Sequence, residues 1–165
     1  MTSALHWSVM DSPIGPLTLL ISNRGARSIQ FGRAPVPTDA PASAGATAEL
    51  AQQLQAYFSG SLQNFDYPLD WVGTPFQQRV WKALLDIPYG ATASYAQVAR
   101  AVGRPKACRA VGGANRRNPL PIVVPCHRVI GSDGALVGYA GRSGLGIKVR
   151  LLALEKALQP SALAS

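Results

Sequence analysis

Short segments of strand-like composition, separated by turn residues, occupy the first third of the chain. Residues 6–10 and 17–21 predict two strands around a turn at residues 11–16. Residues 28–31 predict a third strand after a turn at residues 23–25. The pattern therefore indicates a small sheet at the start of the chain.

A loop and one amphipathic helix follow the expected sheet. Residues 34–48 are rich in Pro, Ala and Ser and have no periodicity, which predicts a loop. Residues 47–58 carry Leu50, Leu54 and two aromatic residues at helical spacing, so they predict a helix that stops at a glycine. Because residues 1–72 contain no recognisable chemistry, we expect them to form an N-terminal α/β scaffold domain.

Helix-start signals open the second half of the chain. Thr74 is a suitable N-cap, Pro75 suits the first turn, and Gln77 completes a capping box. The helix is expected to end before Pro88. Its apolar face is expected to consist of Phe76, Val80, Trp81, Leu84 and Leu85.

Two further helices around a glycine turn predict a helix-turn-helix. Ser94 opens the first of them, with Gln97 three residues later, and Gly103 closes it. Pro105 is expected to start the next helix, which runs toward Asn115. The pattern alone is weak because many two-helix corners resemble it. It is strengthened by the basic residues crowded here, which are Arg100, Arg104, Lys106, Arg109, Arg116 and Arg117.

Prolines and glycines divide the region between these helices and the last one. Residues 118–121 contain two prolines and cannot be helical. Residues 122–124 are a candidate for a short buried strand that leads into Pro125-Cys126-His127-Arg128. The remaining expectations are a turn at 131–134, an extended segment at 136–139 and a glycine-rich loop at 140–146. The last helix is expected to pack through one apolar stripe: Ile147, Leu151, Leu154 and Leu158.

Composition is consistent with a folded protein that stays in the cytoplasm. The chain has 165 residues, and 47% of them are apolar, enough for one domain or two small ones. Its longest apolar runs are too short to span a bilayer, and residues 1–10 do not resemble a secretory signal. We therefore expect a cytoplasmic protein with no membrane partner.

The charge of the chain is concentrated in its second half. Residues 1–72 carry three basic and five acidic residues, a net charge of −2, whereas residues 73–165 carry a net charge of +10. This asymmetry favours a polyanionic partner for the second half over a merely solubilising surface. Nucleic acid is favoured over a membrane because no helix is both basic and strongly apolar on its other face.

Two cysteines are too few for a disulfide framework, and because the two histidines, His6 and His127, lie far apart in the sequence, we expect no structural zinc site. Cys126 becomes a useful nucleophile only if its thiolate is stabilised. Its neighbour His127 points away in extended backbone, so direct pairing requires a turn; the alternative is a buried, inert thiol. Glu155 is either a surface residue or a buried partner of His127. Cys108 is expected to be a small packing residue.

Several segments together resemble the O6-alkylguanine-DNA alkyltransferases, also called methylated-DNA–protein-cysteine methyltransferases. The strongest is Pro125-Cys126-His127-Arg128-Val129-Ile130, which resembles the active-site signature of that family. Nearly all of residues 73–156 match in the right order, whereas the first half matches loosely through residues 11–17. The other matching segments are 74–77 with Trp81, 87–90, 94–95, 109–114, 118–119 and 151–155.

The resemblance implies a two-domain fold of mixed α/β (α+β) class. Residues 1–72 would form a small sheet-and-helix domain of the RNase H-like type. Residues 73–160 would form a mainly helical DNA-binding and active-site domain with a winged helix-turn-helix. Residues 161–165 would be a tail.

The resemblance also implies direct repair of DNA by a single-turnover methyltransferase without metal or cofactor. Cys126 would take the alkyl group from O6-alkylguanine, and by extension from O4-alkylthymine. His127, a water and Glu155 would draw off the thiol proton. Asn118 would brace the turn that carries the cysteine, and Tyr95 would donate a hydrogen bond to the departing purine.

The implied partner is double-stranded DNA containing alkylated guanine, bound by a monomer, singly or cooperatively. The damaged base would be flipped out, with Arg109 filling the vacated space. A helix entering the narrow minor groove must have small side chains on that face, although close helix packing is the alternative reason for such residues. The implied DNA- and base-binding residues are Arg109, Ser94, Ala110, Gly112, Gly113, Ala114, Val129, Tyr139 and Ala140.

Two other functions fit parts of the sequence. A non-catalytic module that binds alkylated bases would share the helix-turn-helix, but relatives of that kind lack the acceptor cysteine. A thiol hydrolase would use Cys126 and His127, but it does not explain the flanking DNA-binding features.

Overall fold

The computed structural model describes residues 4–135 and 144–156. The chain divides into two compact units, Met1–Val72 and Gly73–Ser165. Each unit has its own hydrophobic core, and each is described by itself below. Together they contain both helices and strands, which confirms the expected mixed α/β class.

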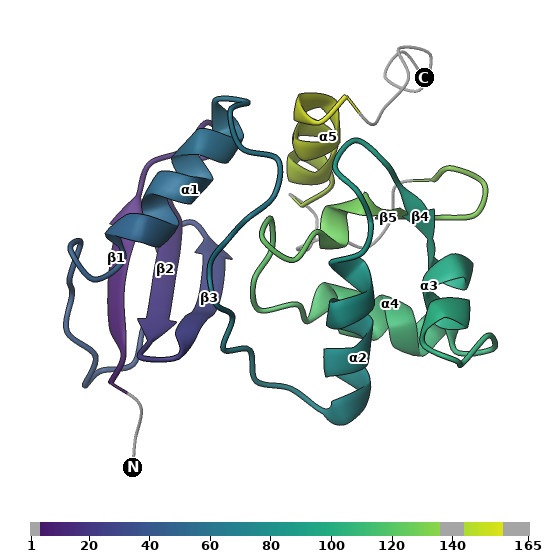
Figure 1. Ribbon diagram of the computed structural model, residues 1–165, viewed down its shortest axis with the longest axis horizontal. Helices are drawn as coiled ribbons and strands as arrows, with labels where there is room; N and C mark the ends of the chain where they lie inside the picture. The colour runs from purple at the N-terminus through teal and green to yellow at the C-terminus, as the bar shows by residue number, and fades with distance from the viewer. Residues whose placement is uncertain (1–3, 136–143, 157–165) are drawn as a thin grey trace. The chain divides into compact units, whose positions relative to one another are not determined.

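The first unit is a three-stranded antiparallel sheet with one helix lying across a face of it (Figure 1). The strands follow chain order: β1 (His6–Met10), β2 (Leu17–Ser22) and β3 (Gly25–Phe31). All three predicted strands are present, but β3 begins three residues earlier than expected. A bulge between Leu20 and Ile21 lets β2 continue pairing with Ala26.

The helix of the first unit, α1 (Ala48–Phe58), matches the predicted segment. It buries Leu50, Leu54 and Tyr57, the positions that the spacing picked out. The core also contains apolar side chains of the sheet, among them Leu17, Leu19 and Ile29. The hydrophobic pattern was sufficient here because sheet and helix each have one buried face.

The second unit is mainly helical (Figure 1). Both predicted capping boxes are present: Thr74 and Gln77 start α2, and Ser94 and Gln97 start α3. A turn at Gly103, whose φ is +75°, separates α3 from α4. The elements are α2 (Pro75–Leu84), β4 (Ala93–Ser94), α3 (Tyr95–Ala101), α4 (Cys108–Arg116), the 3₁₀ turn η1 (Cys126–Arg128), β5 (Val129–Ile130) and α5 (Gly144–Leu154).

Three boundary predictions in this unit were wrong. The helix α4 begins at Cys108 and not at Pro105, because residues 104–107 form a separate turn closed by Ala107 N–H and the Arg104 carbonyl. Residues 122–124 are a buried turn and not a strand, with Ile122 at φ +77° and Val124 N–H bonded to the Leu120 carbonyl. The expected loop at 140–146 is cut short because α5 starts at Gly144.

The buried face of α5 differs from the predicted apolar stripe. Of that stripe only Leu151 is fully buried, while Ile147 and Leu154 are half-buried. The residues that pack inward are Lys148, Leu151, Leu152 and Glu155. Two of these, Lys148 and Glu155, are charged, and a search for apolar periodicity does not detect charged residues. Leu158 and the expected segments 136–139 and 161–165 lie outside the described residues.

The helices of the second unit are joined by a polar contact in their core. Trp81 of α2 is almost fully buried, and its Nε1 donates to the Ala114 carbonyl of α4 at 2.8 Å. Short parallel strands β4 and β5 join the start of α3 to the turn η1. Within residues 4–135 and 144–156, no helix is long and apolar enough to cross a membrane.

Candidate active site

Asn118 braces the turn that leads to Cys126. Its Nδ2 donates to the Val124 carbonyl at 2.8 Å, and its Oδ1 accepts from Leu120 N–H at 2.9 Å. One side chain therefore ties both ends of the buried turn at residues 120–124. Asn115, which the sequence analysis did not single out, donates to the Cys126 carbonyl at 3.3 Å.

Cys126 begins the 3₁₀ turn η1 and is 3% exposed. Pro125 precedes the turn, and its carbonyl accepts from Arg128 N–H at 3.0 Å. This is the local turn that the adjacent positions of Cys126 and His127 require, because in extended backbone the two side chains would point apart. The thiol therefore belongs to a buried turn, directly before a buried histidine.

His127 and Glu155 form the centre of that cluster. The Nε2 of His127 lies 2.7 Å from Oε2 of Glu155, and both side chains are fully buried. Glu155 is therefore the buried partner of His127 and not a surface residue. Burial lowers the pKa of His127 below its usual value; the bond and charge of Glu155 oppose this, and the charges of Arg128 and Lys148 support it.

A lowered pKa keeps the His127 imidazole neutral near pH 7, with one nitrogen protonated. Since Nε2 faces a carboxylate, Nε2 is the nitrogen that carries the hydrogen and donates it to Glu155. The other nitrogen, Nδ1, is a buried acceptor and has no hydrogen-bond partner within residues 4–135 and 144–156. The arrangement provides a nitrogen that can take up a proton.

Arg128 joins the same cluster from the other side of Glu155. Its Nε donates to Oε1 of Glu155 at 2.8 Å and its Nη2 donates to Oε2 at 3.1 Å. Its Nη1 donates to the Ile87 carbonyl at 2.7 Å, and its guanidinium lies over the ring of Tyr89. The guanidinium is therefore fixed on three sides.

Lys148 is a buried cation that the sequence analysis missed. It is fully buried in α5, and its Nζ donates to the Val129 carbonyl at 2.5 Å. Burial lowers the pKa of Lys148 to about 8, while interaction with the charge of Cys126 acts in the opposite direction. The available signal was its helical spacing with Leu151, Leu152 and Glu155, but a lysine is not counted in an apolar face.

Tyr95 lies at the start of α3 and is half-buried. Burial raises the pKa of Tyr95 above its usual value, and the negative charge of Cys126 raises it further, against smaller effects of Arg116 and Asn115. The phenol therefore keeps its proton at neutral pH and is able to donate. The preceding residue, Ser94, uses its hydroxyl to cap α3 through Gln97 N–H at 3.0 Å.

Helix α4 presents small residues and an arginine to solvent. Arg109 and Ala110 are exposed, and Gly112 and Gly113 are half-buried. A Cβ on Gly113 would meet no atom of the described residues within 4 Å, so packing against them does not explain this glycine. Ala114 lies on the opposite, buried face with Trp81 and is not part of this surface.

Three other residues complete the comparison with the sequence. Val129 is buried in β5, where its carbonyl accepts from Lys148. Tyr139 and Ala140 lie outside the described residues. Cys108 was expected to be a packing residue, which is wrong: it is exposed at the first position of α4, where the preceding turn leaves it uncovered.

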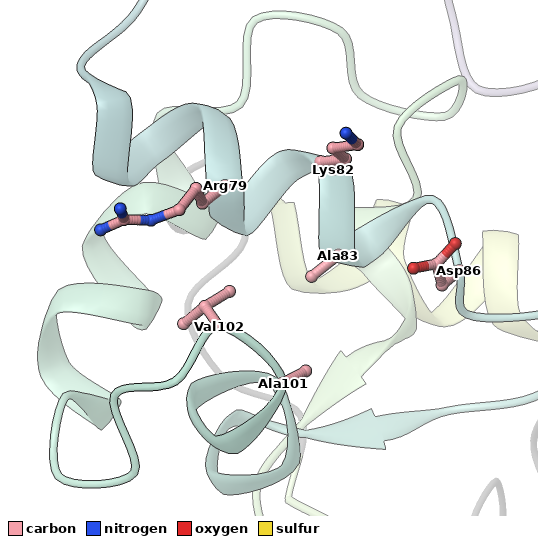
Figure 2. Close-up of a pocket in the computed structure, with 6 residues that line it drawn as sticks. All are labelled: Arg79, Lys82, Ala83, Asp86, Ala101 and Val102. Carbon is pink, nitrogen blue, oxygen red and sulfur yellow. The ribbon is translucent and has the colours of Figure 1, made fainter.

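A pocket of about 290 Å³ lies elsewhere in the second unit, between α2 and the end of α3 (Figure 2). It is lined by Arg79, Lys82, Ala83, Asp86, Ala101 and Val102, and includes none of the residues around Cys126. Within the described part of the chain, no group of three or more His, Cys, Asp or Glu side chains is placed to hold a metal ion.

Comparison with known proteins gives matches along almost the whole chain. Residues 5–71 match the family model of the 6-O-methylguanine DNA methyltransferase ribonuclease-like domain, and residues 75–157 match that of the DNA-binding domain of the same family. The ribonuclease-like description agrees with the fold implied for the first part of the chain. Both models are found in chain order.

The similarity to known relatives extends over nearly the full length of those relatives. A methylated-DNA–protein-cysteine methyltransferase from Methanosarcina barkeri is 49% identical over 156 residues, which are 92% of this chain and 98% of the relative. One from Mycobacterium leprae is 52% identical over 155 residues, 92% of this chain and 93% of the relative. A crystal structure of Mycobacterium tuberculosis OGT in complex with DNA superposes with a TM-score of 0.86 at 49% identity, covering 96% of this chain and 97% of that one.

Proposed function

Because this chain belongs to the 6-O-methylguanine DNA methyltransferase family, we propose that it repairs alkylated DNA by moving the alkyl group onto Cys126. The substrate class is O6-alkylguanine in double-stranded DNA, and O4-alkylthymine by the same chemistry. The observation that carries the proposal concerns the thiol at the start of η1: the next residue along the chain, His127, is paired with the buried Glu155.

The proposed transfer is a single displacement at a saturated carbon. The Sγ of Cys126 forms a bond to the alkyl carbon as the bond from that carbon to O6 of guanine breaks. The electron pair of the broken bond stays on the purine, which takes up one proton, and the thiol gives up one. Because a thioether has no easy hydrolytic exit, each molecule acts once.

Each polar group around the thiol has a proposed role in that step. The Nδ1 of His127 accepts the thiol proton through a water molecule, and Glu155 fixes the tautomer that makes this possible. Tyr95, which keeps its own proton, donates a hydrogen bond to the purine as charge grows on it. Asn118 is a positioning residue that holds the turn carrying Cys126.

We further propose that α4 approaches the minor groove of DNA. Its exposed small residues allow close contact between backbone and groove, and Arg109 fills the space left by the flipped base. Tyr95 also crowds the phosphate at the flipped nucleotide, and Ser94 is a further DNA-binding residue. Backbone at Val129, together with Tyr139 and Ala140, lines the pocket that receives the base. On this proposal residues 1–72 are a scaffold domain and residues 73–160 are the DNA-binding and active-site domain.

The proposal is tested by weighing the protein after exposure to a duplex that contains O6-methylguanine. We expect one methyl group per molecule, located on the peptide that contains Cys126, even with the duplex in excess. Cys126→Ser should bind the duplex but gain no methyl group. Cys108→Ser is the matched control, because that exposed thiol should not be needed.

The other outcomes separate the alternatives. Unmodified protein that still binds the duplex would support a non-catalytic DNA-binding module. Repeated turnover of an ester or amide substrate, abolished by Cys126→Ser, would support a thiol hydrolase. Either result would overturn the proposed transfer.

A further inference from the structure

Glu155 is a buried carboxylate whose two oxygens are both held by one guanidinium. Arg128 donates to Oε1 at 2.8 Å and to Oε2 at 3.1 Å, and Oε2 also faces Nε2 of His127 at 2.7 Å. Arg128 is itself 6% exposed, so these contacts are shielded from water. A two-point contact of this kind fixes the carboxylate plane as well as its position.

The surroundings of Glu155 make a compensating cation necessary. Glu155 directly follows the end of α5, where the negative end of the helix disfavours a carboxylate. Its other partner, His127, is neutral and supplies only a dipole. A buried charge without a partner is strongly unfavourable. Arg128 supplies the full positive charge in contact with this carboxylate.

The position of Arg128 is in turn fixed from outside the pair. Its Nη1 donates to the Ile87 carbonyl at 2.7 Å, and its guanidinium carbon lies 5.7 Å from the centre of the Tyr89 ring. The segment after α2 therefore holds the guanidinium, the guanidinium holds Glu155, and Glu155 holds His127. The chain of contacts ends at Nδ1 of His127.

We propose that Arg128 is a positioning residue for alkyl transfer: by keeping Glu155 ionised and oriented, it keeps Nδ1 of His127 unprotonated. This inference rests on the proposed function for its catalytic consequence, but its first effect is on His127 itself. Without the guanidinium, the His127–Glu155 pair takes up an extra proton at higher pH. Whether that proton charges the imidazole or neutralises the carboxylate, the pair rearranges so that Nδ1 carries a hydrogen.

The direction of the effect follows from the charges that face His127. These are Glu155 beyond the end of α5, Arg128 in the same turn and Lys148 within α5. The charge of Arg128 lowers the pKa of His127, so its removal should raise that pKa. Cys126, the neighbour of His127 in η1, is the same in all the variants below, so it does not contribute to the difference between them.

The first test follows the His127 ring by ¹⁵N NMR across pH in the full-length protein. The chain has only two histidines, so His6→Gln assigns the signals. In the wild type we expect the neutral Nε2–H tautomer to persist at pH values below the usual pKa of histidine, because burial lowers the pKa of His127. In Arg128→Gln we expect Nδ1 to become protonated at a pH about one unit higher. Arg128→Lys, which keeps the charge, should restore a titration close to that of the wild type.

The second test measures alkyl transfer from free O6-benzylguanine as a function of pH, which removes DNA binding from the measurement. Arg128→Gln should lower the rate at pH 7 by about tenfold and move the acid limb of the profile to higher pH. In a Glu155→Gln background, Arg128→Gln should move that limb much less than it does with Glu155 present, because Arg128 acts mainly through Glu155.

An unshifted His127 titration in folded Arg128→Gln would overturn the inference. If that variant does not fold, Arg128→Gln is measured in the Glu155→Gln background, where no buried carboxylate is left unpaired: a His127 shift there of about one pH unit, as large as that expected with Glu155 present, would also overturn the inference. A shifted titration with no methyl group on wild-type Cys126 would instead refute the proposed function and leave the role of Arg128 intact.

Discussion

Adding one methyl group to α4 should raise the stability of the protein and lower its affinity for DNA. Gly113 has helical backbone, and among residues 4–135 and 144–156 a Cβ built there would meet no atom within 4 Å. At Gly112 the nearest atom of the same residues would be Cε1 of Tyr95 at 3.9 Å. Alanine is favoured over glycine inside a helix by about 1 kcal/mol. Gly113→Ala should therefore stabilise the free protein by about 1 kcal/mol, or about 2–4 °C in Tm for a chain of this size.

On DNA the same methyl group should be unfavourable. The minor groove is only about 6 Å wide, so a helix backbone that enters it leaves little room for added side-chain atoms. We expect Gly113→Ala to weaken binding to a duplex by about tenfold, which corresponds to about 1.4 kcal/mol. Transfer from free O6-benzylguanine should be unchanged, because the substitution lies outside the groups around Cys126.

Thermal unfolding, monitored by circular dichroism, measures the effect on stability. Fluorescence anisotropy with a labelled duplex measures the effect on DNA affinity. Gly146→Ala is the matched control, since it adds a methyl group to α5 at a position where a Cβ also meets no atom within 4 Å in the part of the chain that the structure describes. The control should be as stable as the wild type or more so, with unchanged affinity for DNA. If Gly113→Ala binds the duplex as tightly as the wild type does, α4 does not approach DNA through this face.

Three further substitutions test other parts of the site. Arg109→Ala should slow repair of a duplex far more than transfer from the free base, since only the duplex needs a flipped nucleotide; equal slowing would contradict that role. Asn118→Ala removes two hydrogen bonds of the turn before Cys126 and should lower the free energy of unfolding by about 2 kcal/mol, measured by urea denaturation. Lys148 has a folded pKa of about 8 against a usual value of 10.5, so the unfolded chain binds more protons between those values and stability should rise with pH there. Lys148→Met should reduce that rise in urea unfolding at pH 8 and pH 10, and an identical rise would show that Lys148 titrates normally.

Local sequence signals were most successful where structure depends on near neighbours. The capping boxes at Thr74 and Ser94 and the glycine turn at Gly103 are formed by residues within a few positions of one another, and all are present. The strands and α1 were also found, because each has one apolar face. Cys126 stays a prediction that depends on resemblance to a family, since a thiol beside a histidine is by itself weak evidence.

Distant contacts among polar groups could not be predicted in the same way. Glu155 lies 28 positions from His127, and nothing in the local pattern distinguishes it from an exposed helical glutamate. Arg128 looked like one more basic residue of a basic segment, yet it is buried against Glu155 and the Ile87 carbonyl. Lys148 was overlooked because its charge conceals its place in a buried helix face.

Most of the helices and strands, both capping boxes and the unequal charge of the two halves could be predicted without the fold. These depend on composition and on spacing over a few residues. Only the tertiary structure decided which charges are buried and paired, that residues 122–124 form a turn, and that Ala114 faces inward while Gly113 faces out. The physical reason is that burial and pairing are properties of surfaces brought together by folding, and one charged residue has the same appearance in a sequence whether it lies in water or beside its partner.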